Sequence, residues 1–141
     1  WYKSKHDSLT AEYGEFKSVT VVHIPPYQAE KEYSEGDFLY GDKREGVCES
    51  GFDAGLFEAM KEMGAQAVFS GHDHVNDWAA LYEGIYLVYS QSSDYNLYGL
   101  GGYNNAVCLP ESEWLQGCTL TTIAQDGSIA IEQKKNSRFL K

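Results

Sequence analysis

Three of the four histidines in this chain stand where a strand-like run of residues ends. The motif Gly-His-Asp-His at residues 71–74 directly follows the apolar run 67–70, and His23 follows the β-branched run 19–22. Imidazole is the commonest protein ligand for metals such as zinc and iron, and a loop leaving a strand can hold it rigidly while keeping it accessible. The pattern therefore predicts a metal centre built from His23, His72 and His74.

Two kinds of metal centre fit this pattern. If segment 72–74 is extended, His72 and His74 project to the same face with their Cα atoms roughly 6 to 7 Å apart. Two metal ions about 3.5 to 4 Å apart could then each take one of these rings. A single tetrahedral zinc could instead take His23, His72 and His74 and leave its fourth position for water. Both arrangements predict a hydrolase. His6 lies in a charged helical context, where a histidine is expected to be exposed or hydrogen bonded.

Polar residues surround the histidine motif. Asp73 points away from its two neighbours in an extended segment, so it is either solvated or fixes the loop. Metal-bound histidines usually donate their second N–H to a carboxylate or a carbonyl, so Asp77, which follows Asn76, is a candidate acceptor. The alternative for Asp77 is a turn or capping residue before Trp78.

The first half of the chain predicts alternating helices and strands. Residues 1–13 have the character of a helix that Gly14 ends, and the run 19–24 is a strand that two prolines end. Residues 27–47 are polar without a sustained period and are interpreted as a long excursion. A second helix, capped by Ser50 or Asp53, is predicted from apolar residues at helical spacing (Leu56, Phe57, Met60 and Met63), with Gly64 closing it.

The order strand, helix, strand is a β-α-β unit. Such units place two parallel strands side by side with a right-handed connection, and their carboxyl ends meet at one edge of the sheet. Ligands of open α/β sheets bind at that edge, so His23 and His72 are expected to face one crevice.

The second half predicts antiparallel hairpins. The runs 78–82 and 85–89 flank a Glu-Gly turn, and the runs 119–124 and 129–132 flank an Asp-Gly turn. The tract 90–105 is rich in Gly, Tyr, Ser and Asn and is suited to a loop over a site. Its tyrosines either line the mouth of that site or pack within the loop; they are Tyr95, Tyr98 and Tyr103.

Composition narrows the class of protein. The 141 residues fit one domain, and the net charge of -10 makes nucleic acid and anionic membranes poor partners. No run approaches the roughly 18 to 20 apolar residues that span a bilayer. The three cysteines form no C-x-x-C pair, which argues against a zinc knuckle. Cys108 and Cys118 could bridge in an oxidising compartment or be buried free thiols, so the compartment stays open.

Two motifs resemble those of the calcineurin-like metallophosphoesterases, in particular the purple-acid-phosphatase-like branch. They are VHIPP at residues 22–26 and VFSGHDHVND at residues 68–77. The resemblance implies that His23 and His72 bind one ion of a dinuclear centre and His74 the other. It also implies hydrolysis of phosphomonoesters or phosphodiesters, with two ions drawn from Fe, Mn and Zn and a phosphorylated small molecule or phosphoprotein as substrate. Family members can be secreted or vacuolar.

The chain departs from that family in what precedes His23. The Asp-x-His, Gly-Asp-x-x-Asp and Gly-Asn-His-Asp/Glu segments of the family are absent, and Gly36-Asp37 and Gly41-Asp42 do not replace them. Residues 1–141 therefore resemble a single partial domain, the carboxyl-terminal half of an α/β fold in which helices flank a β-sandwich. We expect an exposed sheet face that the missing amino-terminal half or a second copy covers, and little activity in isolation. The alternatives are a mononuclear zinc hydrolase complete in this chain and a non-catalytic β-rich interaction module.

Overall fold

The computed structural model describes residues 1–35, 38–93, 98–99 and 116–135. Its mixed α/β fold agrees with the fold class predicted from the sequence. The helices are α1 (Tyr2–Tyr13), α2 (Gln28–Glu35) and α3 (Leu56–Glu62). The strands are β1 (Ser18–Val21), β2 (Phe38–Tyr40), β3 (Ala65–Ser70), β4 (Ala79–Tyr82), β5 (Ile85–Tyr89), β6 (Gly117–Ile123) and β7 (Ile129–Lys135).

Five strands form a mixed sheet in the order β1-β3-β5-β4-β2, and β6 and β7 form a separate two-stranded sheet. Strand β3 pairs in parallel with both β1 and β5. The predicted β-α-β unit is confirmed, since β1 and β3 are parallel neighbours with α3 between them in the sequence. The two hairpins, β4–β5 and β6–β7, are also confirmed.

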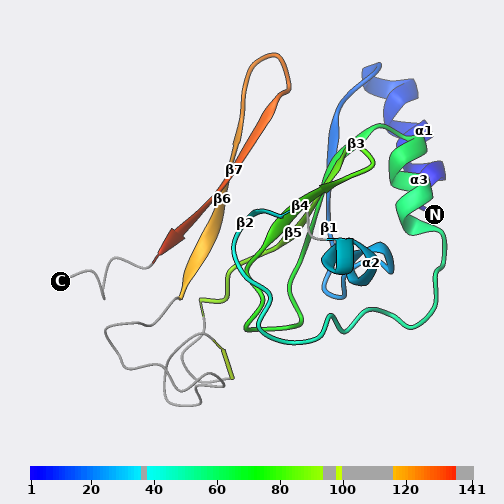
Figure 1. The fold of residues 1–141 in the computed structure, drawn as a ribbon. Coiled ribbons are helices and arrows are strands. Elements are labelled where there is room, and N and C mark those ends of the chain that lie inside the picture. Colours follow the sequence, from blue (N-terminus) through cyan, green and yellow to red (C-terminus); the bar gives the residue numbers. More distant parts are fainter. Residues whose placement is uncertain (36–37, 94–97, 100–115, 136–141) are drawn as a thin grey trace.

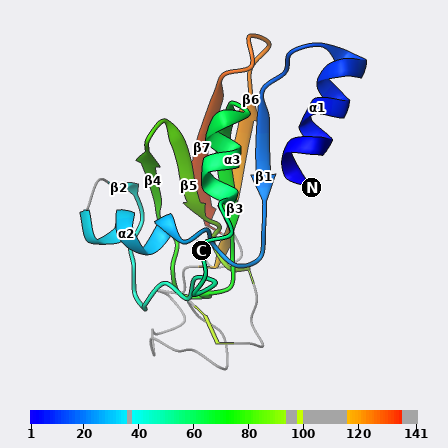
Figure 2. The same ribbon diagram turned by 90° about the vertical axis from the view of Figure 1, so that its right-hand side faces the viewer.

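The five-stranded sheet lies between the helices and the β6–β7 hairpin (Figures 1 and 2). Alternate residues of each strand point to opposite faces, so the helix-facing residues are in register with one another, as Val68 and Leu87 are. They pack with Phe57 and Met60 of α3 around the fully buried ring of Trp78. This core fixes β3 and β5, and therefore the loops that leave their carboxyl ends.

Two sequence-based expectations for the first half are wrong. The excursion 27–47 contains regular structure, namely α2 and β2, and Phe38 of β2 packs against the Trp78 ring. A strand as short as β2 has too few residues to show a period, which explains the miss. Helix α3 begins at the glycine N-cap Gly55 instead of Ser50 or Asp53. Asp53 still accepts a hydrogen bond from the Gly55 N–H, at 2.8 Å.

Candidate metal centre

His23 and His72 meet at the carboxyl ends of β1 and β3. The Gly71 N–H donates to the His23 carbonyl at 3.2 Å, which ties the two strand exits together. The ring centroids are 4.9 Å apart in an edge-to-face arrangement, and His72 Nδ1 lies 3.1 Å from His23 Nε2. Two nitrogens bound to one tetrahedral zinc are separated by about 3.3 Å, given Zn–N bonds of about 2.0 to 2.1 Å. The pair therefore has the spacing of two ligands on one ion.

The backbone at His72 is strained. Its φ is 68°, a conformation that residues other than glycine adopt rarely, and the Asp73 N–H donates to the Gly71 carbonyl at 2.8 Å. A three-residue turn with a positive φ at its centre is the uncommon γ-turn, so segment 72–74 is not extended. The expectation that His72 and His74 share one face because of an extended backbone is therefore wrong. The turn directs His72 toward His23.

His74 lies against Tyr98. The two rings are stacked, with centroids 4.5 Å apart and an angle of 5° between their planes. His74 Nδ1 lies 2.9 Å from the Tyr98 carbonyl oxygen, and a carbonyl only accepts, so this nitrogen carries the proton. The Nε2 lone pair is then available to a cation, which is the arrangement usual for a metal-bound histidine. The acceptor is the Tyr98 carbonyl, whereas the sequence offered Asp77 as a candidate acceptor or as a turn residue.

Three buried polar side chains near the histidines hold the segment 42–48 instead of orienting the imidazoles. Asp77 accepts from the Asp42 N–H at 3.0 Å, and Asn76 accepts from the Arg44 N–H at 2.9 Å. Asp73 accepts from the Cys48 N–H at 2.9 Å. These bonds fix a stretch of chain that has no helix or strand of its own, and they seat it beside His72.

Asp77 and Asp73 differ in the groups that donate hydrogen bonds to their carboxylates. Burial raises the pKa of Asp77, and the hydrogen bond from Arg44, whose Nη1 lies 2.6 Å from Asp77 Oδ1, counteracts part of that shift. Asp73 accepts a hydrogen bond from the buried Tyr89 hydroxyl, and burial raises the pKa of Tyr89. Asp77 thus has a cationic partner, and the contacts that Asp73 makes are with neutral donors.

Cys48 is the functional candidate that sequence reasoning missed. Its sulfur, a ring nitrogen of His72 and a carboxylate oxygen of Asp73 all lie within 4.8 Å of one another. A single cysteine outside any C-x-x-C pair carries no sequence signal for a metal, and the segment that holds it has no periodicity. Only the tertiary hydrogen bonds of segment 42–48 bring it to the histidines.

These donors are of the types that bind metal ions such as zinc and iron. His23 and His72 have the spacing for one ion, and His74 offers one nitrogen to another. A carboxylate oxygen of Asp73 lies within 4.8 Å of a ring nitrogen of His72, and Asp73 Oδ2 accepts from Cys48 and Tyr89. The described residues therefore place His23 and His72 at the spacing of two ligands, and His74 beside them offers one further nitrogen. Tyr95 and Tyr103 lie outside the described residues, as does Cys108.

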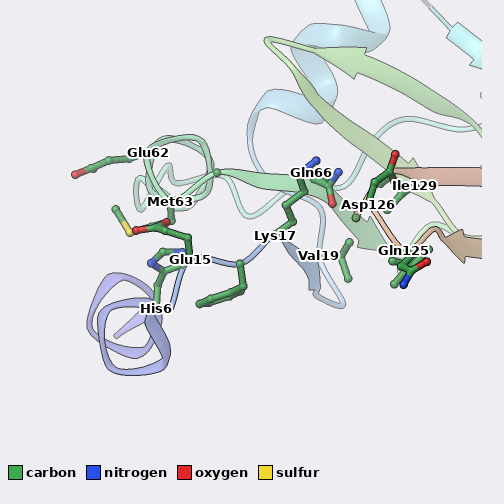
Figure 3. A pocket seen from close by; sticks show the side chains of 14 residues that line it. His6, Glu15, Lys17, Val19, Glu62, Met63, Gln66, Gln125, Asp126 and Ile129 are labelled. Carbon is green, nitrogen blue, oxygen red and sulfur yellow. The ribbon is translucent and has the colours of Figure 1, made fainter. Parts of the chain in front are cut away.

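A large cavity of about 790 Å³ lies elsewhere and contains none of these three histidines. It is lined by residues from α1, from the end of α3, from the starts of β1 and β3, and from the β6–β7 turn (Figure 3). Its ionisable side chains include His6, Glu15 and Lys17. Helix α1, which borders this cavity, has no buried residue. The cavity therefore reflects the open packing of α1 and does not mark the candidate metal centre.

Comparison with curated proteins identifies three plant relatives. The chain is 37% identical over 76 residues to probable inactive purple acid phosphatase 14 of Arabidopsis thaliana, which is 53% of the chain and 19% of that protein. It is 31% identical over 78 residues to probable inactive purple acid phosphatase 28, covering 55% and 20%. It is 34% identical over 64 residues to probable inactive purple acid phosphatase 29, covering 45% and 16%. Both of these are also from Arabidopsis thaliana.

No protein-family model and no solved structure matches the chain. Among the residues described, no helix has the length and apolar character needed to cross a bilayer. The chain spans about a fifth of the length of the curated relatives it matches. Over about half of its own length the chain is similar to purple acid phosphatase-like proteins, in agreement with the motifs around His23 and His72.

Proposed function

We propose that the protein containing this chain is a metal-dependent phosphoric ester hydrolase to which the chain contributes His23, His72 and His74. The observation that carries the proposal is the 3.1 Å approach of His72 Nδ1 to His23 Nε2 at the carboxyl edge of two parallel strands. The similarity to purple acid phosphatase-like proteins supports the phosphoesterase family. The substrate in this proposal is a phosphorylated small molecule or a phosphoprotein.

In this proposal His23 and His72 hold one ion and His74 contributes to a second, drawn from Fe, Mn and Zn. Bound ions would supply charge neutralisation at the phosphoryl oxygens and an activated water. The chain's own residues position these groups. The Tyr98 carbonyl fixes the tautomer of His74, and the turn at His72 fixes the direction of that ring. The remaining ligands, including a bridging carboxylate, would come from outside this chain.

The test compares the complete protein with the isolated 141-residue chain in hydrolysis of p-nitrophenyl phosphate with added Mn²⁺ or Zn²⁺. We expect turnover of order 1 per second or more only in the complete protein, and its loss in His72→Ala. His6→Ala is the matched control, because His6 contacts Phe16 and Thr10, away from the proposed centre. Turnover that survives His72→Ala would contradict the proposal, and enzyme-like turnover by the isolated chain would show that it needs no further ligands.

A second candidate function is metal binding without catalysis. It is favoured by the names of the three relatives, each of which is described as probably inactive. Stoichiometric metal binding by the complete protein without hydrolysis of any phosphoric ester would support it. One tightly bound Zn²⁺ per isolated chain, lost in His74→Ala, would instead favour a mononuclear zinc hydrolase.

We also propose that the remainder of the same protein covers the hairpin-facing side of the five-stranded sheet. Strand β1 is at the end of that sheet, and its Val21 is 77% exposed. A groove of about 460 Å³ separates β1 and β3 from β6, and Ile123 on the groove side is 64% exposed. Within the described residues, β1 and β6 are therefore end strands beside one groove, which strands of a covering partner would extend.

A further inference from the structure

The geometry points to a site for one thiophilic divalent cation, such as Zn²⁺, formed by Cys48, His72 and Asp73. Their ligand atoms lie within 4.8 Å of one another. In a tetrahedral zinc site with sulfur, nitrogen and oxygen ligands, neighbouring ligand atoms are about 3.3 to 3.7 Å apart. The group is thus about 1 Å wider than a loaded site, and small side-chain rotations close that difference. Water would complete the tetrahedron.

The position of Cys48 is built into the structure by buried groups. Its backbone N–H donates to Asp73 Oδ2, and Asp73 is 5% exposed. The preceding segment is anchored in the same way by Asn76, which is fully buried, and by Asp77. A surface loop that merely passes the histidines would not need three buried acceptors for its backbone. The sulfur is therefore held beside the His72 ring by the same residues that complete the core.

Charge favours a cation at this place. The carboxyl group of Asp73 is buried, and among the described residues it accepts hydrogen bonds from the Cys48 N–H and the Tyr89 O–H, neither of which carries a charge. A buried carboxylate is stabilised when a countercharge is present. A thiolate and a carboxylate together offset the two charges of Zn²⁺, which two neutral imidazoles cannot do. Cys48 is exposed, so an ion can enter from solvent.

This inference goes beyond the proposed function and does not rest on it. It needs no phosphoric ester, no second ion and no residue from outside the chain. It shares only His72 with the predicted phosphoesterase centre, and it adds a sulfur ligand that the three-histidine interpretation lacks. The two proposals can therefore fail separately, because one is tested by hydrolysis in the complete protein and the other by metal binding to the chain.

Titration of the chain with Co²⁺ under a phosphine reductant tests the site. We expect one Co²⁺ per chain with the visible bands of a tetrahedral ion and a thiolate-to-cobalt charge-transfer band in the near ultraviolet. Cys48→Ser should abolish the charge-transfer band and weaken binding at least about tenfold. Cys118→Ser is the matched control, because Cys118 is also an exposed free thiol, on β6. His6→Ala should leave the band and the affinity unchanged, because His6 contacts Phe16 and Thr10, away from Cys48.

A charge-transfer band that persists in Cys48→Ser would overturn the inference, as would Co²⁺ binding to the wild-type chain without such a band. Equal loss of binding in His74→Ala would also overturn it and favour the three-histidine site. A readout on the wild-type chain keeps the test independent of whether the variants fold. Stoichiometric Zn²⁺ should slow alkylation of Cys48 at least about tenfold while Cys118 reacts at its usual rate. Equal alkylation rates with and without Zn²⁺ would contradict the site.

Discussion

The environments of Asp77 and Asp126 shift the pKa values of these two carboxyl groups in opposite directions. Burial raises the pKa of Asp77 above its ordinary value of 3.8 despite the Arg44 guanidinium. The Ser128 N–H and hydroxyl lower the pKa of Asp126, which is exposed at the β6–β7 turn. The same residue type thus makes two opposite contributions to the pH dependence of folding.

Replacement of each aspartate by asparagine should reveal that the two residues change the pH dependence of stability in opposite directions. A raised folded pKa means that the native state binds the proton more tightly, so the stability contributed by Asp77 is greatest below pH 3.8 and is lost as the pH rises through the raised value. The stability of the wild type relative to Asp77→Asn should therefore fall as the pH increases above 3.8. We expect urea unfolding between about pH 3 and pH 7 to show this slope.

Asp126→Asn provides the control of opposite sign. Its lowered folded pKa contributes stability that is present above pH 3.8 and lost as the pH falls through the lowered value. The loss of the Arg44 partner in Asp77→Asn shifts its whole curve without changing the slope, since arginine does not titrate in this range. Parallel curves for the wild type and Asp77→Asn would contradict the argument.

Tyr89 supports Asp73 from within the core. Its hydroxyl donates to Asp73, and leaving a buried acceptor without its donor costs about 1 to 3 kcal/mol. Tyr89→Phe should lower the free energy of unfolding by that amount, as measured in urea. Tyr86→Phe, on the same strand but on the hairpin-facing side, is the control and should have a smaller effect. Equal effects of the two substitutions would show that the Asp73 contact does not stabilise the fold.

At the scale of elements, the sequence predicted what periodicity and turn chemistry encode. Strand β1, helix α3, strand β3 and both hairpins follow from β-branched runs, helical spacing and Glu-Gly or Asp-Gly turns. The order of strands and helices places the carboxyl ends of β1 and β3 side by side, which is why the meeting of His23 and His72 could be predicted. Segment 42–48 has neither a periodic pattern of apolar residues nor a turn motif. Its position depends on hydrogen bonds to Asp73, Asn76 and Asp77, which lie about 30 residues later, so Cys48 could not be placed in advance.

Gly41 is the point at which strand β2 passes into segment 42–48. Its φ is +81°, and a Cβ at this position would lie 2.0 Å from the Asp77 carbonyl oxygen. That close backbone approach permits the Asp42 N–H to reach the Asp77 carboxylate, at 3.0 Å. The glycine therefore matters for two separate reasons, conformation and space.

Gly41→Ala should destabilise the fold by more than the conformational cost alone. A residue other than glycine at positive φ costs about 1 to 2 kcal/mol. The clash adds to this, because backbone atoms of Asp77 and Trp78 cannot move without disturbing β4. Gly51→Ala is the matched control, with a φ of +64° and nothing within 4 Å of the added Cβ. Thermal unfolding should show a clearly larger drop in Tm for Gly41→Ala, and equal drops would contradict the clash.

At the scale of the whole molecule, the two faces of the five-stranded sheet differ in how well they are covered. The helix-facing side is packed around Trp78, whereas the hairpin covers the other side only in part. Val19, Val21 and Ile123 line a groove, and within the described residues β1 is the end strand of its sheet and β6 pairs with β7 alone. An exposed apolar face bordered by strand edges favours association with further strands.

In isolation, this face should pair with a second copy of the chain. The double variant Val21→Thr with Ile123→Thr keeps the β-branched shape that strands prefer and removes apolar surface from the groove. Sedimentation velocity should show self-association of the wild-type chain that is reduced in this variant. Leu120→Thr is the control, because Leu120 is 44% exposed on β6 and alternates with the groove-facing residues Thr119 and Thr121. Equal association of all three chains would exclude the groove as the contact.

The complete protein should respond differently if its remaining strands cover the groove. Val21 would then be buried, and a threonine hydroxyl placed there without a hydrogen-bond partner would cost about 1 to 3 kcal/mol. Val21→Thr should therefore destabilise the complete protein by that amount and leave the free energy of unfolding of the monomeric isolated chain nearly unchanged, because Val21 is 77% exposed in the chain alone. Denaturant unfolding of both forms measures the difference. Equal costs in the two forms would mean that this edge of β1 stays exposed in the complete protein and that the covering strands lie elsewhere.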